Sequence, residues 1–73
     1  MENMEKAYMH IWHANDERIK ELEQGIMELC DNSYAIKTLL EEHSRAAQRA
    51  GLAMCEAGFD TYDEIAEAWE DEH

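Results

Sequence analysis

The feature that most constrains the fold is a heptad repeat in the first third of the chain. Its members recur at alternating steps of four and three residues. They are Tyr8, Trp12, Asn15, Ile19, Leu22, Ile26 and Leu29. Residues three and four apart lie on the same side of an α-helix, so the repeat predicts a long helix with one packing face. The rest of the chain must supply a second surface that covers this face.

The first helix is expected over residues 2–30. Asn15 or Asp16 could instead cap a second helix that begins at Glu17, because short polar side chains favour helix N-termini. The heptad keeps its phase through Asn15, which favours one continuous helix. Gly25 lies inside the repeat and costs about 1 kcal/mol relative to Ala. Its presence suggests a close contact with a neighbouring helix.

A second helix is expected over residues 33–57, after a tight turn at Asp31-Asn32-Ser33. A short connection makes neighbouring helices antiparallel, so the second helix should fold back along the first. Its inward positions are predicted to be Ile36, Leu40, His43, Ala47, Ala50, Met54 and Ala57, widened by Leu39, Ala46 and Ala53. In this register the large Trp12 meets the small residues Ala50, Gly51 and Ala53, which would fill the core densely.

A short third helix is expected over residues 62–70. Gly58 has the signature of a left-handed residue that ends the second helix, with Phe59 packing back on its last turn. Thr61 and Glu64 then form a predicted capping box, in which each side chain accepts a hydrogen bond from the other residue's amide. This helix is too short to be stable alone, so it should dock on the open end of the hairpin.

These elements predict an all-α fold for a single helical domain over residues 1–73: an antiparallel helical hairpin plus a short third helix. The chain has no proline and no strand pattern. A domain of this size removes only about 60% of the surface of its unfolded chain, so a monomer would be marginally stable. A homodimer in the form of a helix bundle would relieve that shortage.

The charge of the chain limits its partners. Eighteen acids against six bases give a formal net charge of −12. This charge disfavours direct binding to nucleic acid or to an anionic membrane surface, and favours a basic partner. No apolar run approaches the roughly 18 residues needed to span a bilayer, and the charged N-terminus does not resemble a signal peptide. We therefore expect a cytoplasmic protein.

Few residues suggest chemistry. His10 and His13 are three apart on one helix face, and Glu17 follows, but no further ligand motif completes a zinc site, so no metal or cofactor is predicted. His43 is expected to bond to a neighbouring carboxylate and not to act as a catalytic base. No nucleophile has a recognisable base, so we predict that the chain is not an enzyme.

The two cysteines are predicted to be reduced. Cys30 and Cys55 fall near opposite ends of the expected second helix, and the 25 positions between them would span about 37 Å. A disulfide requires Cα atoms roughly 4.4 to 6.8 Å apart, which this separation excludes.

The feature that folding explains least is an acidic C-terminus. Residues 56–73 contain no Lys or Arg and eight acids, namely Glu56, Asp60, Asp63, Glu64, Glu67, Glu70, Asp71 and Glu72. In helical form this segment would be about 27 Å long, with one negative charge per about 3.4 Å, close to the phosphate spacing along one DNA strand. The alternative is a solvated acidic segment that keeps the protein soluble.

In size, acidity and helical content, the chain resembles the small phage or mobile-element proteins that inhibit nucleic-acid-binding host machinery, including DNA mimics and anti-CRISPR inhibitors. The resemblance implies an inhibitor whose acidic surface occupies a Lys/Arg-lined channel of a nucleic-acid-binding effector. The alternative is a regulatory or assembly adaptor, such as an antitoxin, that binds its partner through its apolar seam and Met-rich end. Met4, Tyr8 and Met9 are the candidate contacts for that second function.

Overall fold

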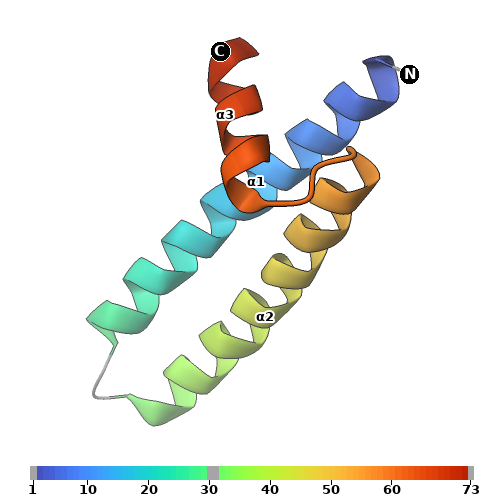
Figure 1. The fold of residues 1–73 in the computed structure, drawn as a ribbon. Helices are drawn as coiled ribbons and strands as arrows, with labels where there is room; N and C mark the ends of the chain where they lie inside the picture. The colour runs from blue at the N-terminus through green and yellow to red at the C-terminus, as the bar shows by residue number, and fades with distance from the viewer. Residues whose placement is uncertain (1, 30–31, 73) are drawn as a thin grey trace.

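Three helices make up the fold of this chain (Figure 1), seen in a computed structural model that describes residues 2–29 and 32–72. They are α1 (Glu2–Glu28), α2 (Ser33–Glu56) and α3 (Tyr62–Glu72). α1 and α2 lie side by side in opposite directions, and α3 packs across the N-terminal half of α1. No strand occurs within residues 2–29 and 32–72, so the predicted all-α class is confirmed. The molecule is elongated, at 46 × 19 × 17 Å.

α1 is continuous through Asn15, as the phase of the heptad predicts. The Asn15 side-chain nitrogen donates a hydrogen bond to the Ile11 carbonyl oxygen at 2.8 Å. The side chain therefore bonds within the helix, and the alternative of a break at this position is wrong. The helix ends at Glu28, slightly before the predicted end, and Cys30 lies outside the described residues.

Asn32 begins α2 as an N-cap. Its backbone is extended, and its side-chain oxygen accepts a hydrogen bond from the Ala35 amide at 3.1 Å. This bond satisfies one of the free amides at the helix N-terminus, which is why Asn is favoured there. The predicted start of the second helix at Ser33 is thus confirmed, while Asp31 of the predicted turn lies outside the described residues.

The end of α2 has the hydrogen bonds of a Schellman motif. Gly58 has a φ of 91°, in the region that glycine favours, and its amide donates to the Cys55 carbonyl at 3.0 Å. The Phe59 amide donates to the Met54 carbonyl at 3.1 Å, and the Phe59 ring packs against the core. This pair of bonds satisfies the last carbonyls of the helix and confirms the predicted role of Gly58.

One of the two hydrogen bonds predicted for the capping box of α3 is present, and the other has a different donor. The Thr61 hydroxyl accepts a hydrogen bond from the Glu64 amide at 3.2 Å, which confirms the first half. The Glu64 carboxylate, however, accepts from the Asp60 amide at 3.3 Å and not from the Thr61 amide. The chain bends at Asp60 and Thr61, which brings the Asp60 amide within reach of the first helical turn.

All three helices contribute to one core cluster. Its buried members are Met9, Trp12, Ala50, Ala53, Ala57 and Ile65. Ile65 is fully buried, although α3 carries few other large apolar residues. Trp12 lies in the same cluster as Ala50 and Ala53, as the predicted register requires. A large indole against small alanines lets the two helices approach closely.

The inward face of α2 is rotated from the predicted heptad positions. Leu40 is 51% exposed and Ala47 is exposed, whereas Ala46 and Ala53 are buried. The repeat itself is kept, but its second position lies one residue earlier than predicted: the buried or half-buried positions are Ile36, Leu39, His43, Ala46, Ala50, Ala53 and Ala57. Leu29, at the end of the predicted repeat in the first helix, is likewise exposed.

Candidate functional site

The acidic residues of the C-terminal region all reach solvent. Seven of them lie on α3 or just before it and are called here the α3 acidic surface: Asp60, Asp63, Glu64, Glu67, Glu70, Asp71 and Glu72. Within the described ranges, none of the seven forms an ion pair with Lys, Arg or His. The surface therefore presents carboxylates whose charge no neighbouring side chain neutralises.

Glu56 lies apart from the other seven predicted acids. It occupies the last turn of α2 and lines a groove together with Tyr8, Ile11 and Leu52. α3 instead packs on the side of α1 that carries His10 and His13. The structure thus brings together seven of the eight acids and leaves Glu56 on another side of the hairpin.

Aromatic contacts hold α3 in place. The Trp69 ring stacks on the His13 ring with centroids 4.0 Å apart and planes 10° apart, and it meets the His10 ring edge-on at 5.0 Å. At the other end of α3, the Tyr62 ring meets Trp12 edge-on at 5.6 Å. Both histidines thus meet Trp69, and His13 also lies beside Trp12, with ring centroids 6.2 Å apart. They therefore position α3 against α1.

A buried carboxylate adds a polar link at the start of α3. Asp16 is only 7% exposed, and it accepts hydrogen bonds from the Tyr62 hydroxyl at 3.2 Å and from the Lys20 ammonium at 3.3 Å. The sequence suggested Asp16 only as a helix cap. Its spacing of four from Lys20 was the available signal of a pair, but nothing in the sequence pointed to Tyr62, 46 residues away.

These contacts change two ionisation equilibria. Partial burial, followed by the charge and hydrogen bond of Asp16, raises the pKa of the Tyr62 hydroxyl above its usual value. The hydrogen bond to Asp16, followed by the charges of Asp16 and Glu17, raises the pKa of the Lys20 ammonium. Both shifts favour the protonated forms, which are the forms that donate to Asp16.

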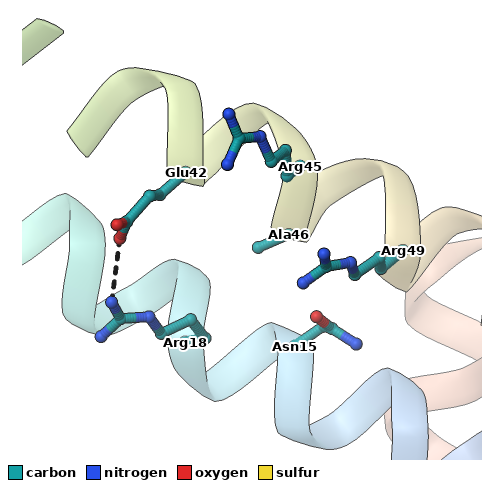
Figure 2. Close-up of a pocket in the computed structure, with 6 residues that line it drawn as sticks. All are labelled: Asn15, Arg18, Glu42, Arg45, Ala46 and Arg49. Atoms are coloured by element: carbon teal, nitrogen blue, oxygen red, sulfur yellow. Dashed lines mark hydrogen bonds and ion pairs between the residues drawn. The ribbon is translucent and has the colours of Figure 1, made fainter. Parts of the chain in front are cut away.

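A basic cleft lies between α1 and α2. Figure 2 shows three arginines around it, and it is about 270 Å³ in volume. It is lined by Asn15, Arg18, Glu42, Arg45, Ala46 and Arg49. Arg18 pairs with Glu42 at 2.9 Å, while Arg45 and Arg49 form no ion pair with any described residue. Half of the six Lys and Arg residues of the chain thus gather here.

Of the three residues predicted to contact a partner in the alternative function, one is buried. Met9 is 4% exposed and belongs to the core, so it is not accessible to a partner, and its inclusion as a contact was wrong. Met4 is exposed and Tyr8 is half-buried. Ile11 and Leu52, which the sequence did not single out as contacts, line the adjacent groove with Tyr8.

The remaining candidate residues have ordinary surroundings. His43 lies 3.1 Å from a Glu23 carboxylate oxygen, which confirms the carboxylate partner predicted for it. Cys55 is exposed with a free thiol, and Cys30 lies outside the described residues.

Over the ranges 2–29 and 32–72, no group of three or more His, Cys, Asp or Glu residues could hold a metal ion. Nor does that part of the chain contain a helix long and apolar enough to cross a membrane.

Comparison of the chain with protein-family models, with curated proteins and with solved structures finds no match.

Proposed function

We propose that this protein is an inhibitor that binds a basic, nucleic-acid-binding surface of a partner protein. In this proposal the carboxylates of the α3 acidic surface take the place of nucleic-acid phosphates and block the surface by charge and by volume. The partner is a Lys/Arg-rich effector, and the inhibitor acts in the cytoplasm without a catalytic residue or cofactor. The resemblance in size and acidity to phage-type DNA mimics and anti-CRISPR inhibitors supports the same proposal.

The observation that carries the proposal is the density of unpaired charge on α3. The helix has 11 residues and six of them are acids, all exposed. At 1.5 Å per residue it is about 16 Å long, which gives one negative charge per about 2.7 Å. This density lies between that of one DNA strand, about 3.4 Å per charge, and that of the duplex, about 1.7 Å.

The attachment of α3 supports the same proposal. Trp69, Tyr62 and Ile65 fix one side of the helix to the hairpin, so the opposite side displays its acids in one orientation. A surface that is ordered before binding loses less conformational entropy when the partner binds. A segment that served only solubility would need no such attachment.

The experiment is capture of partners from a bacterial lysate on the immobilised chain, with elution by a salt gradient. We expect nucleic-acid-binding proteins that elute as the salt rises, because screening weakens contacts between exposed charges. A captured protein should also be released by a short DNA or RNA that competes for the same surface. Captured proteins that are released neither by salt nor by a competing nucleic acid would contradict the proposal.

A charge-reversal variant tests the surface itself. Asp63, Glu67 and Asp71 lie four residues apart along one exposed stripe, and replacing all three with Lys should abolish capture. Glu64 is left unchanged because its carboxylate caps the Asp60 amide. The matched control reverses three exposed acids of the hairpin, which gives the same net charge. These control residues are Glu5, Glu28 and Glu41. Equal loss of binding in both variants would mean that net charge, and not α3, determines binding.

A second candidate function is a regulatory or assembly adaptor, such as an antitoxin, that binds through apolar side chains. The exposed apolar side chains near the N-terminal half of α1, Met4, Ile11 and Leu52, favour it. Binding of this kind should not weaken with salt. It should be lost in Met4→Glu or Tyr8→Glu variants and retained when the α3 acids are reversed.

A further inference from the structure

An apolar groove on the hairpin is unexplained by the fold or by the proposed inhibitor. It lies between α1 and α2 and has a volume of about 220 Å³. It is lined by Tyr8, Ile11, Arg49, Leu52, Ala53 and Glu56. Ile11 is 47% exposed and Leu52 is 67% exposed, and they project from neighbouring helices into solvent. Exposed apolar side chains that gather in one place are typical of a binding surface.

The charged residues of the groove are arranged about its apolar centre. Arg49 and Glu56 lie seven residues apart on α2, about two helical turns, with Leu52 between them. Neither forms an ion pair within the described part of the chain. A two-fold axis perpendicular to α2 near Leu52 would place Arg49 of one copy opposite Glu56 of another, and the reverse. The groove is therefore complementary to itself, as the interface of a two-fold dimer must be.

The chain exposes more surface than a compact monomer of its mass, as expected for a subunit that lacks its partner. Its accessible surface is 5397 Å², whereas a compact monomer of 8.5 kDa exposes roughly 4,700 Å². The excess of roughly 700 Å² is close to the roughly 800 Å² that each partner buries in a standard interface. The extra area follows from the elongated shape, in which α3 covers one side of the hairpin near its open end. The groove stays open to solvent, with Ile11 and Leu52 both exposed.

We propose that this groove is the interface of a two-fold symmetric homodimer. Ile11 and Leu52 of each copy pack together at the centre, and Arg49 pairs with Glu56 of the second copy on both sides of the axis. The two copies of α2 then lie antiparallel and face each other over their last two turns, from Arg49 to Glu56.

The net charge of −12 on each copy does not prevent this assembly. α3 packs on the side of α1 that carries His10, His13 and Asp16, away from Ile11 and the groove. The two α3 acidic surfaces therefore face outward in the dimer. Repulsion between them is screened at physiological salt, where the Debye length is about 8 Å. The groove itself contributes one positive and one negative side chain from each copy.

Sedimentation equilibrium of the full chain tests the proposal. We expect twice the monomer mass for the wild type. Arg49→Glu and Glu56→Arg should each raise the dissociation constant at least about tenfold, because each places two like-charge pairs in the interface. The double variant Arg49→Glu/Glu56→Arg restores opposite charges across the axis, and its dissociation constant should return to within about threefold of the wild type. Circular dichroism of each variant controls for folding.

Three outcomes would overturn the proposal. The first is a wild-type chain that stays monomeric up to about 1 mM. The second is a dimer that neither reversal weakens, which would place the interface elsewhere. The third is a dimer that both reversals weaken but the double variant does not restore, which would exclude the two-fold pairing of Arg49 with Glu56.

Cysteine cross-linking locates the axis independently. In a Cys30→Ser/Cys55→Ser background, Leu52→Cys should oxidise rapidly to a disulfide-linked dimer, because the two copies of residue 52 meet near the axis. Met27→Cys is the matched control, since Met27 is also exposed but lies about 24 Å along α1 from Ile11. Equal cross-linking at both positions, or none at residue 52, would exclude the proposed axis.

Discussion

Trp12 is the side chain at which the three helices meet. It packs with Ala50 and Ala53 of α2, and its ring also meets Tyr62 at the start of α3. Met9 of α1 and Ile65 of α3 are buried in the same cluster. Asp16, one turn further along α1, adds the hydrogen bond to Tyr62. The hairpin and the docking of α3 therefore depend on adjacent residues of one helix.

Replacing Trp12 with Ala should unfold or nearly unfold the protein. The change removes a buried indole from a core that is otherwise rich in alanine, at a cost of about 3 to 5 kcal/mol in unfolding free energy. This cost is a large fraction of the stability of a small domain. Urea unfolding followed by circular dichroism measures it, and an unchanged midpoint would contradict the packing described.

Tyr62→Phe isolates the polar link to α3. The variant removes the hydroxyl that donates to Asp16 but leaves Lys20 as the partner of that carboxylate, so we expect a loss of about 1 kcal/mol. Asp16→Ala should cost more, because it removes the acceptor of both bonds. Urea midpoints of the two variants provide the comparison, and equal midpoints would argue against the Asp16 link.

The same hydroxyl predicts a dependence on alkaline pH. The pKa of Tyr62 is raised in the folded protein, so folding favours the protonated phenol. Its contribution to stability is fully present below the ordinary tyrosine pKa of about 10 and is lost as the pH rises through the raised value. Between about pH 9 and 12, the wild type should lose more stability than Tyr62→Phe. Parallel curves for the two proteins would show that Tyr62 ionises as it does in the unfolded chain.

Two glycines near the end of α2 should respond oppositely to the same substitution. Gly51 lies within the helix with no atom within 4 Å of an added Cβ, so Gly51→Ala should stabilise the protein by about 0.5 to 1 kcal/mol. Gly58 has a φ of 91°, so Gly58→Ala should destabilise it by about 1 kcal/mol or more. Thermal melts of both variants test the assignment of the helix end, which requires opposite shifts.

The elements were largely predictable because their signals are local. Asn32, Gly58 and Thr61 act on the backbone within a few residues, and each has the predicted structural role. The inward face of α2 was less predictable, since the choice between Leu39 and Leu40, or between Ala46 and Ala47, depends on how the neighbouring helix packs. The contact of Asp16 with Tyr62 could not be predicted, because it depends on how α3 crosses α1.

In the candidate site, too, local features could be predicted from the sequence, whereas features that depend on helix packing could not. The acids of α3 could be predicted to be exposed, because no apolar periodicity includes them. Their separation from Glu56 could not, since it requires the position of α3 relative to the hairpin. Met9 was misassigned for a related reason: it and Met4 both lie near the N-terminus, but only a structure shows which one faces the core.

Charge is segregated over the whole molecule. Acids cover α3, while half of the Lys and Arg residues gather in the cleft between α1 and α2 on the hairpin (Figure 2). The acids of α3 form no ion pair with the other described residues, so they repel one another, which destabilises the folded state. Such an arrangement predicts opposite effects of salt on folding and on the proposed binding.

Stability should rise with salt while partner binding falls. Raising the ionic strength from about 0.01 to about 0.15 M shortens the Debye length from about 30 to about 8 Å, which screens repulsion among exposed carboxylates and should raise the melting temperature. The Asp63→Lys/Glu67→Lys/Asp71→Lys variant, whose net charge is −12 + 6 = −6, should show a smaller rise. The hairpin control with Glu5, Glu28 and Glu41 reversed has the same net charge but keeps the α3 acids. If repulsion is concentrated on α3, the melting temperature of the control should depend on salt more nearly as that of the wild type does. Equal responses of the two variants would show that the repulsion is spread over the whole surface.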